Sequence, residues 1–374
     1  MPNTSRPASA ASRPFPAMSR RTVFALAAGS VLGITACGPV RVGGPAEYTP
    51  PPPGIDDLYR VDLLALLDRT VASTEALRDR AGAGTGASDG GGEPAPVPPD
   101  VGVTDALAAL SRALPVQREA LLTGAQAERE SEQAEDPDPH ATTAPAPTAT
   151  ATDLAGLIAL LVELRELCVD AARQVSGSLA RPVCALGAHT TWAAARLHRT
   201  SGQGEVPGPR AAEDIAPTRA VPQQDPPSIG AESDYHQYIE AAQEQEWYTA
   251  YVHEVLAASA EGTAREDHLT AVEEHRARAD ALLTIATEDG APPVERQAVY
   301  PLPGGTLSGR SAAQLPSLLS EALLVGHVSL VGAAPFERRA VSIEAAMAEA
   351  GVLASLVGRL EPLPSMAPEG AAEE

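Results

Sequence analysis

The 374-residue chain contains no lysine, so all 27 of its basic residues are arginine. They are outnumbered by 49 acidic residues. A chain with this surplus of negative charge is repelled by nucleic acid and by anionic lipid headgroups. Calcium sites need a loop of alternating Asp or Asn with a Gly, and we find no such loop in the sequence. The charge balance therefore argues against nucleic-acid binding.

Aromatic residues are also scarce, at 3% of the chain. Leu, Val and Ala must then do most of the packing, which favours helices that approach each other closely. Few β-branched alternations occur, so strands are hard to place. A Gly-x-Ser-x-Gly elbow, a zincin motif and a nucleotide-binding glycine pattern are all missing from the sequence. We therefore predict an all-α fold and no catalytic residue.

The first 36 residues contain no acidic residue. Within them, four arginines precede the apolar run Val23–Thr35. About 20 apolar residues are needed to span a bilayer, and this run has 13. The layout is that of an export signal, which we place at residues 1–36. Residues 19–24 resemble a twin-arginine signal; the general secretory route is the alternative.

The tetrad Ile34-Thr35-Ala36-Cys37 resembles the lipobox of bacterial lipoproteins. The resemblance implies that the Cys37 thiol receives a diacylglyceryl group and that cleavage makes Cys37 the first residue. Two acyl chains, such as palmitate, give stable anchoring where one does not. We therefore expect the protein on the outer face of the plasma membrane, with the membrane as its first partner. An unmodified thiol at an ordinary cleavage site is the alternative.

Without the four leader arginines, 23 arginines face 49 acidic residues, which gives the mature chain a charge of −26. Proline runs and helical periodicity then divide the chain. We predict a lipidated Pro-rich tether at 37–54, an N-terminal helical bundle with disordered loops at 55–199, a linker at 200–230, a four-helix domain at 231–362 and an acidic tail at 363–374.

Each predicted bundle has four helices. In the first we expect helices at 55–80, 104–131 with a kink at Pro115, 153–175 and 182–198. In the second we expect them at 231–260, 263–287, 311–333 and 335–360. A long Pro-rich loop separates the second and third helices of this second bundle. One wide connection between two helical hairpins is typical of ferritin-like bundles.

Three segments carry a family resemblance: the helix segment 273–280 (EEHRARAD), the turn 290–293 (GAPP) and the loop 298–303 (AVYPLP). In this order they resemble an uncharacterised ferritin-like domain, a domain of unknown function found in lipoproteins of GC-rich Gram-positive bacteria. The resemblance covers residues 229–362. It implies a ferritin-like four-helix bundle at the cell envelope, and it implies no activity.

Ferritin-like bundles often hold two metal ions, bound in each half by a Glu and a Glu-x-x-His pair. Here His275 is preceded three residues earlier by Val272, and Glu344 is followed three residues later by Met347. Neither pair is complete, so we expect no cofactor. The alternative is an iron or manganese oxidase or storage protein. Its candidate ligands are Glu244, His275, Glu321 and Glu344, with Glu246 as a further carboxylate.

Cys168 and Cys184 are the other two cysteines. Export makes a disulfide plausible. In an antiparallel hairpin, however, the two cysteines are mismatched by about 6 Å relative to the turn, at 1.5 Å per residue. Two buried thiols are the alternative.

Five of the chain's 12 aromatic residues fall between Tyr235 and Tyr251. Most suit a core, but Trp247 lies off the helical stripe of the others. A third hypothesis is therefore a small-ligand carrier with a pocket between the bundles near Trp247. The hypothesis that we favour is a non-enzymatic binding or scaffolding module for an envelope partner.

Overall fold

Segments rich in alanine and leucine form helices throughout the part of the chain that the structure describes. A computed structural model describes residues 53–83, 101–135, 151–221, 232–302 and 309–366. The first half contains α1 Ile55–Ala83, α2 Val101–Glu119, α3 Gly124–Glu135, α4 Leu154–Gln174 and α5 Gly177–Ser201. The second contains α6 Glu232–Ser259, α7 Gly262–Asp289, α8 Gly309–Ala333 and α9 Ala340–Leu356. No strand occurs within these ranges, so the all-α prediction is confirmed there.

Two short 3₁₀ helices complete the description: η1 Ala212–Asp214 and η2 Phe336–Arg338. The predicted export signal, Cys37 and most of the predicted tether lie outside the described residues, as does most of the acidic tail.

The predicted helix at 104–131 is wrong, because the structure divides it into α2 and α3. Pro115 lies within α2 without ending it. The break comes at Thr123, whose Oγ1 accepts from Gln126 N while Gln126 Oε1 accepts from Thr123 N. This reciprocal pair is a capping box, the signature of a new helix N-terminus.

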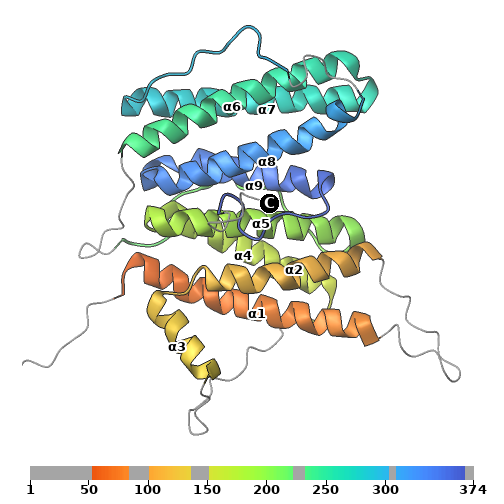
Figure 1. Cartoon of the computed structure of the whole chain (residues 1–374), viewed down its shortest axis with the longest axis vertical. Coiled ribbons are helices and arrows are strands. Elements are labelled where there is room, and N and C mark those ends of the chain that lie inside the picture. The colour runs from red at the N-terminus through yellow and green to blue at the C-terminus, as the bar shows by residue number, and fades with distance from the viewer. Residues whose placement is uncertain (1–52, 84–100, 136–150, 222–231, 303–308, 367–374) are drawn as a thin grey trace, which may run out of the picture. The chain divides into compact units, whose positions relative to one another are not determined.

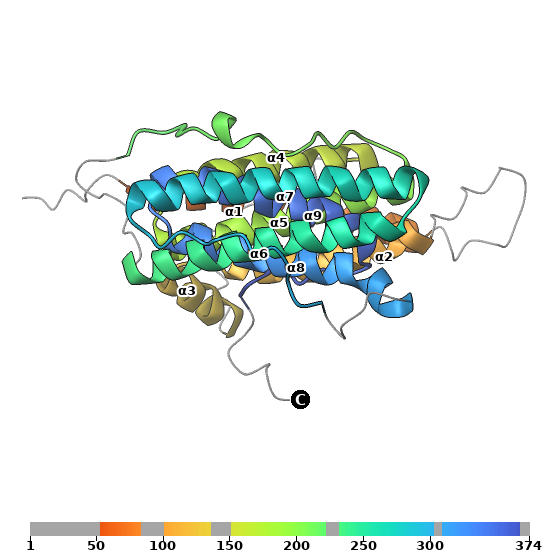
Figure 2. The same ribbon diagram turned by 90° about the horizontal axis from the view of Figure 1, so that it is seen from above.

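The helices form two bundles in tandem (Figure 1). In the first, α1 packs against α2 and α4, and α5 packs against the same two helices. In the second, α6 packs against α7 and α8, and α9 packs against the same two. Viewed from above, α6 and α7 run side by side along their whole length (Figure 2).

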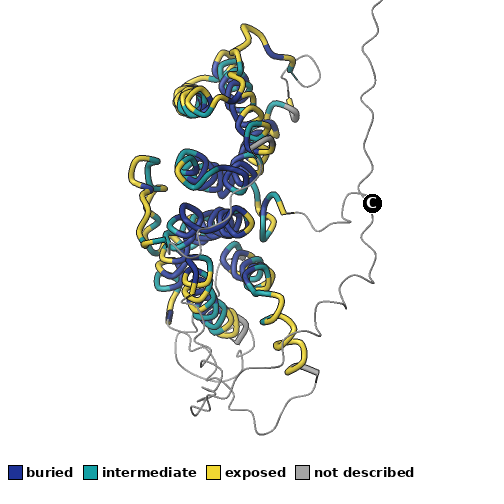
Figure 3. The backbone as a smooth tube through the Cα atoms, turned by 90° about the vertical axis from the view of Figure 1, so that its left-hand side faces the viewer, coloured by how far each residue is buried: buried dark blue, intermediate teal, exposed yellow. Residues whose placement is uncertain are grey.

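The two bundles share a hydrophobic core. Helix α5 packs against α8 and α9, and one buried apolar cluster joins residues of α4 and α5 to Val328 of α8 and Met347 of α9. Buried residues accordingly lie on the facing sides of the helices (Figure 3). The contact is close: a Cβ added at Gly187 of α5 would lie 2.9 Å from Cys168 Cβ and 3.1 Å from Met347 Cε.

A buried arginine links the same two bundles. Arg339, between η2 and α9, has no exposed surface. Its guanidinium donates to the carbonyls of Ala172 and Val175 at 3.1 and 2.6 Å, and to Ala334 O at 2.9 Å. The last carbonyls of a helix lack intrahelical partners, so Arg339 caps the C-terminal end of α4. Burial, and then the charge of Arg173, lower the pKa of Arg339 to about 10.

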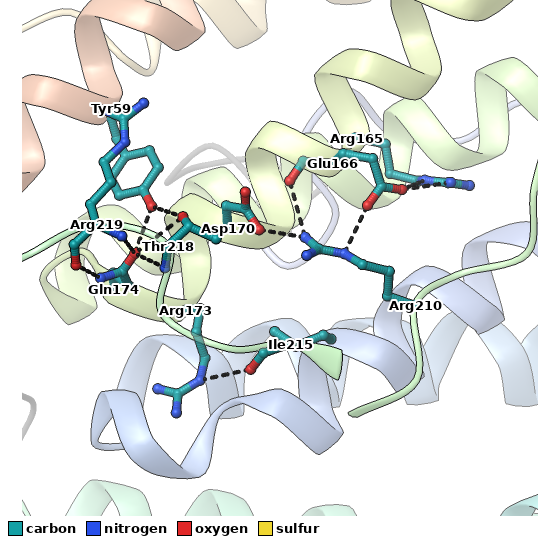
Figure 4. Close-up of polar contacts among 10 residues, drawn as sticks. All are labelled: Tyr59, Arg165, Glu166, Asp170, Arg173, Gln174, Arg210, Ile215, Thr218 and Arg219. Carbon is teal, nitrogen blue, oxygen red and sulfur yellow. Dashed lines mark hydrogen bonds and ion pairs between the residues drawn. The ribbon is translucent and has the colours of Figure 1, made fainter. Parts of the chain in front are cut away.

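The segment between the bundles, which was predicted as a linker, is described as far as residue 221 and lies along α4 (Figure 4). Arg210 donates to Asp170 Oδ1 at 2.6 Å. Gln174 Oε1 accepts from Tyr59 OH at 2.7 Å and from Thr218 N at 2.9 Å. These contacts fasten residues 210–219 to α1 and α4.

Within the described residues, Ala312–Ala333 is the one stretch long and apolar enough to cross a membrane. This is weak support for a membrane span, because 56% of the stretch is buried inside the protein. A core helix of a soluble protein has the same composition.

Candidate functional site

The α6–α7 hairpin aligns its residues in pairs. Glu246 and His275 are equally distant along the chain from the Ala260–Glu261 connection, so antiparallel packing places them at the same level. On the side away from the connection, Ile239 and Leu282 belong to one buried apolar cluster. The Glu246 level is therefore a buried polar layer next to an apolar one.

Glu246 lies at the centre of this layer and has no exposed surface. Its Oε2 is 2.7 Å from His275 Nδ1, and its Oε1 is 2.8 Å from His327 Nε2 of α8. Burial by itself raises the pKa of Glu246. The hydrogen bonds from both histidines and the charges of His327 and Arg278 oppose it and lower the pKa to about 2. Glu246 is therefore an ion at neutral pH, and both imidazoles donate to it.

Arg278 and Glu349 complete the layer. Arg278 Nη1 lies 2.5 Å from Glu349 Oε1 of α9 and 3.6 Å from Glu246 Oε1. Burial would lower the pKa of Arg278, but the charges of Glu349 and Glu246 raise it. One guanidinium thus stands between two buried carboxylates, which is how a protein makes buried charges tolerable.

These five residues form what we call the Glu246 cluster: Glu246 of α6, His275 and Arg278 of α7, His327 of α8 and Glu349 of α9. All four helices of the second bundle contribute to it. His275 and Arg278 are three residues apart, which puts both side chains on one face of α7.

The structure disperses the four metal-ligand candidates taken from the sequence. Glu244 and Glu321 are exposed on α6 and α8. Glu344 Oε2 accepts from Ala212 N at 3.1 Å, so this carboxylate holds the segment before α6 instead. His275 is engaged with Glu246. Within the described ranges, no group of three or more His, Cys, Asp or Glu is arranged to hold a metal ion.

Sequence reasoning named Glu246 only as a further carboxylate and overlooked Arg278, His327 and Glu349. A signal was present for each of them. His327 follows Leu323 and Leu324 on the apolar face of α8, and Glu349 precedes Leu353 on that of α9. An ionisable residue in phase with an apolar stripe must be buried, and a buried charge needs a partner.

Trp247 belongs to the core. Its side chain is 7% exposed and packs with Ala279 and Tyr300, beneath the Arg296 guanidinium at 5.5 Å. A groove of about 410 Å³ does lie between α5 of the first bundle and α6 and α8 of the second. Its lining includes Arg181, Tyr238 and Ser329 and does not include Trp247.

Cys168 and Cys184 are free thiols in the structure, and both are fully buried. The structure therefore has the two buried thiols and not the disulfide that export would allow. Burial raises the pKa of Cys184 to about 12 and also raises that of Cys168. Both thiols are protonated at neutral pH and act as small apolar groups.

A family model described as a domain of unknown function (DUF4439) matches residues 239–368, the region that includes α7, α8, α9 and most of α6. Searches of curated proteins and of solved structures found no match. The chain therefore contains a DUF4439 domain, and the Glu246 cluster lies inside it.

Proposed function

We propose that this protein is a lipid-anchored module on the outer face of the plasma membrane, with a non-enzymatic binding or scaffolding role. Its second bundle is a ferritin-like bundle in which an arginine takes the place of metal ions. The Cys37 tetrad and the basic, acid-free leader support the anchor and the export. The Glu246 cluster supports a second bundle that needs no metal ion.

The observation that most strongly supports a metal-free bundle is the position of Arg278. Di-metal bundles place carboxylates and imidazoles from all four helices around two cations. Here all four helices also contribute, but the positive charge between Glu246 and Glu349 belongs to a guanidinium. Arginine is always protonated and always present, so the cluster needs no ion to balance its carboxylates.

The donor set does not fit a di-metal centre. Both oxygens of Glu246 already accept hydrogen bonds from imidazoles, and the Nδ1 of His275 is a donor rather than a ligand. Glu349 Oε1 is held by Arg278. An ion with several oxygen and nitrogen ligands would have to displace the guanidinium and break these contacts.

A metal analysis tests the proposal. The full chain is produced with a tag free of histidine, in medium supplemented with iron and manganese, and its metal content is measured by mass spectrometry. We expect both metals far below one ion per chain. Stoichiometric iron or manganese that disappears in a Glu246→Gln variant would overturn the proposal, because such an ion would sit in the cluster.

A further inference from the structure

A second polar pair lies further along the same hairpin. His253 of α6 and His268 of α7 are symmetric about the Ala260–Glu261 connection, as Glu246 and His275 are. Each histidine is seven residues nearer the connection than the corresponding member of the first pair. Seven residues are two helical turns, so this pair faces the same way and lies nearer the end of the hairpin.

The two rings turn the same nitrogen toward one another. His253 Nδ1 and His268 Nδ1 are 3.2 Å apart. The ring centroids are 5.1 Å apart, and the ring planes are inclined at 70°. A tetrahedral zinc ion with bonds of about 2.0–2.1 Å holds two ligand nitrogens about 3.3 Å apart. The two rings form a hydrogen bond at this separation, and the same separation also suits two ligands of one ion.

Solvent can reach the pair, because His253 and His268 are only half-buried. An ion can therefore enter without opening the bundle, and water can fill the positions that the protein leaves. Neutral imidazole is a ligand that Zn²⁺, Ni²⁺ and Cu²⁺ all accept.

A third imidazole lies beside the pair. The rings of His275 and His253 have centroids 5.5 Å apart. His275 donates its Nδ1–H to Glu246 and so belongs to the Glu246 cluster and not to the pair.

We infer that His253 and His268 form a binding site for one divalent transition-metal ion of the Zn²⁺, Ni²⁺ or Cu²⁺ class, held through their Nδ1 atoms with water or an outside ligand in the open positions. The two ligands lie nearer the end of the hairpin than the Glu246 cluster, and His275, the cluster member beside His253, is not one of them. It does not depend on the proposed function.

The test is a calorimetric titration of the full chain with ZnCl₂, again with a tag free of histidine. We expect one ion per chain. His253→Ala and His268→Ala should each weaken the binding by more than about tenfold, since changes behind a ligand already cost ten- to hundredfold. His236→Ala, on the same helix as His253, should bind as the wild type does.

A further variant separates this site from the bundle centre. His327→Gln should leave zinc binding unchanged, because His327 contacts Glu246 and not the pair. Loss of binding in His327→Gln with retention in both pair variants would place the ion in the Glu246 cluster and would overturn the inference. So would the absence of zinc binding by the wild type. Thermal unfolding of each variant checks that it is folded. If His253→Ala does not fold, the more peripheral His268→Ala decides whether the pair binds zinc.

Discussion

Glu246 is a carboxylate without exposed surface whose oxygens accept hydrogen bonds from imidazoles on two different helices. Removing a charge from water is costly unless its partners are well placed. Such a residue disfavours alternative packings of the four helices, because they would leave a buried charge without partners. We regard specification of one packing as the role of the cluster at the residue scale.

This residue makes a prediction about acid. The pKa of Glu246 in the folded protein is about 2, below its ordinary value of 4.5. Its ionisation therefore stabilises the fold above the unfolded pKa, and this contribution is lost as the pH falls from about 4.5 toward 2. As the pH falls through this range, the free energy of unfolding, measured with urea at a series of pH values, should decrease less steeply in Glu246→Gln than in the wild type.

The matched control is Glu295→Gln, because Glu295 is exposed. This variant should keep the wild-type dependence on pH. Equal slopes for Glu246→Gln and the wild type would show that Glu246 is not held as a buried ion.

At the element scale, glycine marks where helices touch. Gly187 has no room for a Cβ against Cys168 and Met347, whereas nothing lies within 4 Å of the Cβ position at Gly351 of α9. Alanine is favoured over glycine within helices by about 1 kcal/mol, and overpacking costs about 1–3 kcal/mol. We expect Gly351→Ala to stabilise the protein and Gly187→Ala to destabilise it, as measured by urea unfolding. A stabilising Gly187→Ala would refute the close contact of α5 with α4 and α9.

Arg339 gives a second test at this scale. Replacing it by Met removes the donors to Ala172, Val175 and Ala334 and leaves buried carbonyls at the end of α4 without a partner. Hydrogen bonds to charged groups contribute about 1.5–3 kcal/mol each, so we expect a loss of about 3 kcal/mol or more. Arg359→Met, at an exposed arginine, should change the stability by less than about 0.5 kcal/mol. Similar values for both variants would contradict the capping role.

Sequence patterns predicted the helices of the second bundle to within five residues at each end, because Pro and Gly mark the ends of long apolar repeats. In the first bundle, Asp153, at which a helix was predicted to begin, is the N-cap of α4. In the second, Gly290 ends α7 with φ 72°. The Thr123 break was missed because the capping box consists of only two residues. Most aromatic residues of α6 were expected in the core, yet Tyr238, Tyr248 and Tyr251 are only partly buried. Tyr248 instead packs on the loop residue Tyr300.

At the scale of the whole molecule, the sequence predicts two bundles but not their contact. Periodicity reports that a helix has an apolar face, not which helix covers it. The shared core of α5, α8 and α9 and the Arg339 bridge both depend on pairings between residues more than 100 positions apart. The members of the Glu246 cluster also come from four helices, so each appears in the sequence as an isolated residue.

The anchor is tested on the whole protein in cells. In Cys37→Ser the thiol that the resemblance assigns to lipidation is absent, so we expect the protein to be found in the soluble fraction and to carry no fatty acid by mass spectrometry. Cys168→Ser and Cys184→Ser, which change buried thiols of α4 and α5, should both remain with the membrane. Retention of Cys37→Ser in the envelope with normal leader processing would contradict the anchor.

The central claim is that Arg278 supplies the positive charge between Glu246 and Glu349. A double-mutant cycle of Arg278 with Glu349 tests it most directly. Arg278→Met and Glu349→Met are compared singly and together by urea unfolding. Breaking a buried pair from one side costs about 3–5 kcal/mol, while removing both partners leaves no unpaired charge. We predict a coupling energy of about 2 kcal/mol or more. Additive effects of the two substitutions would contradict the claim.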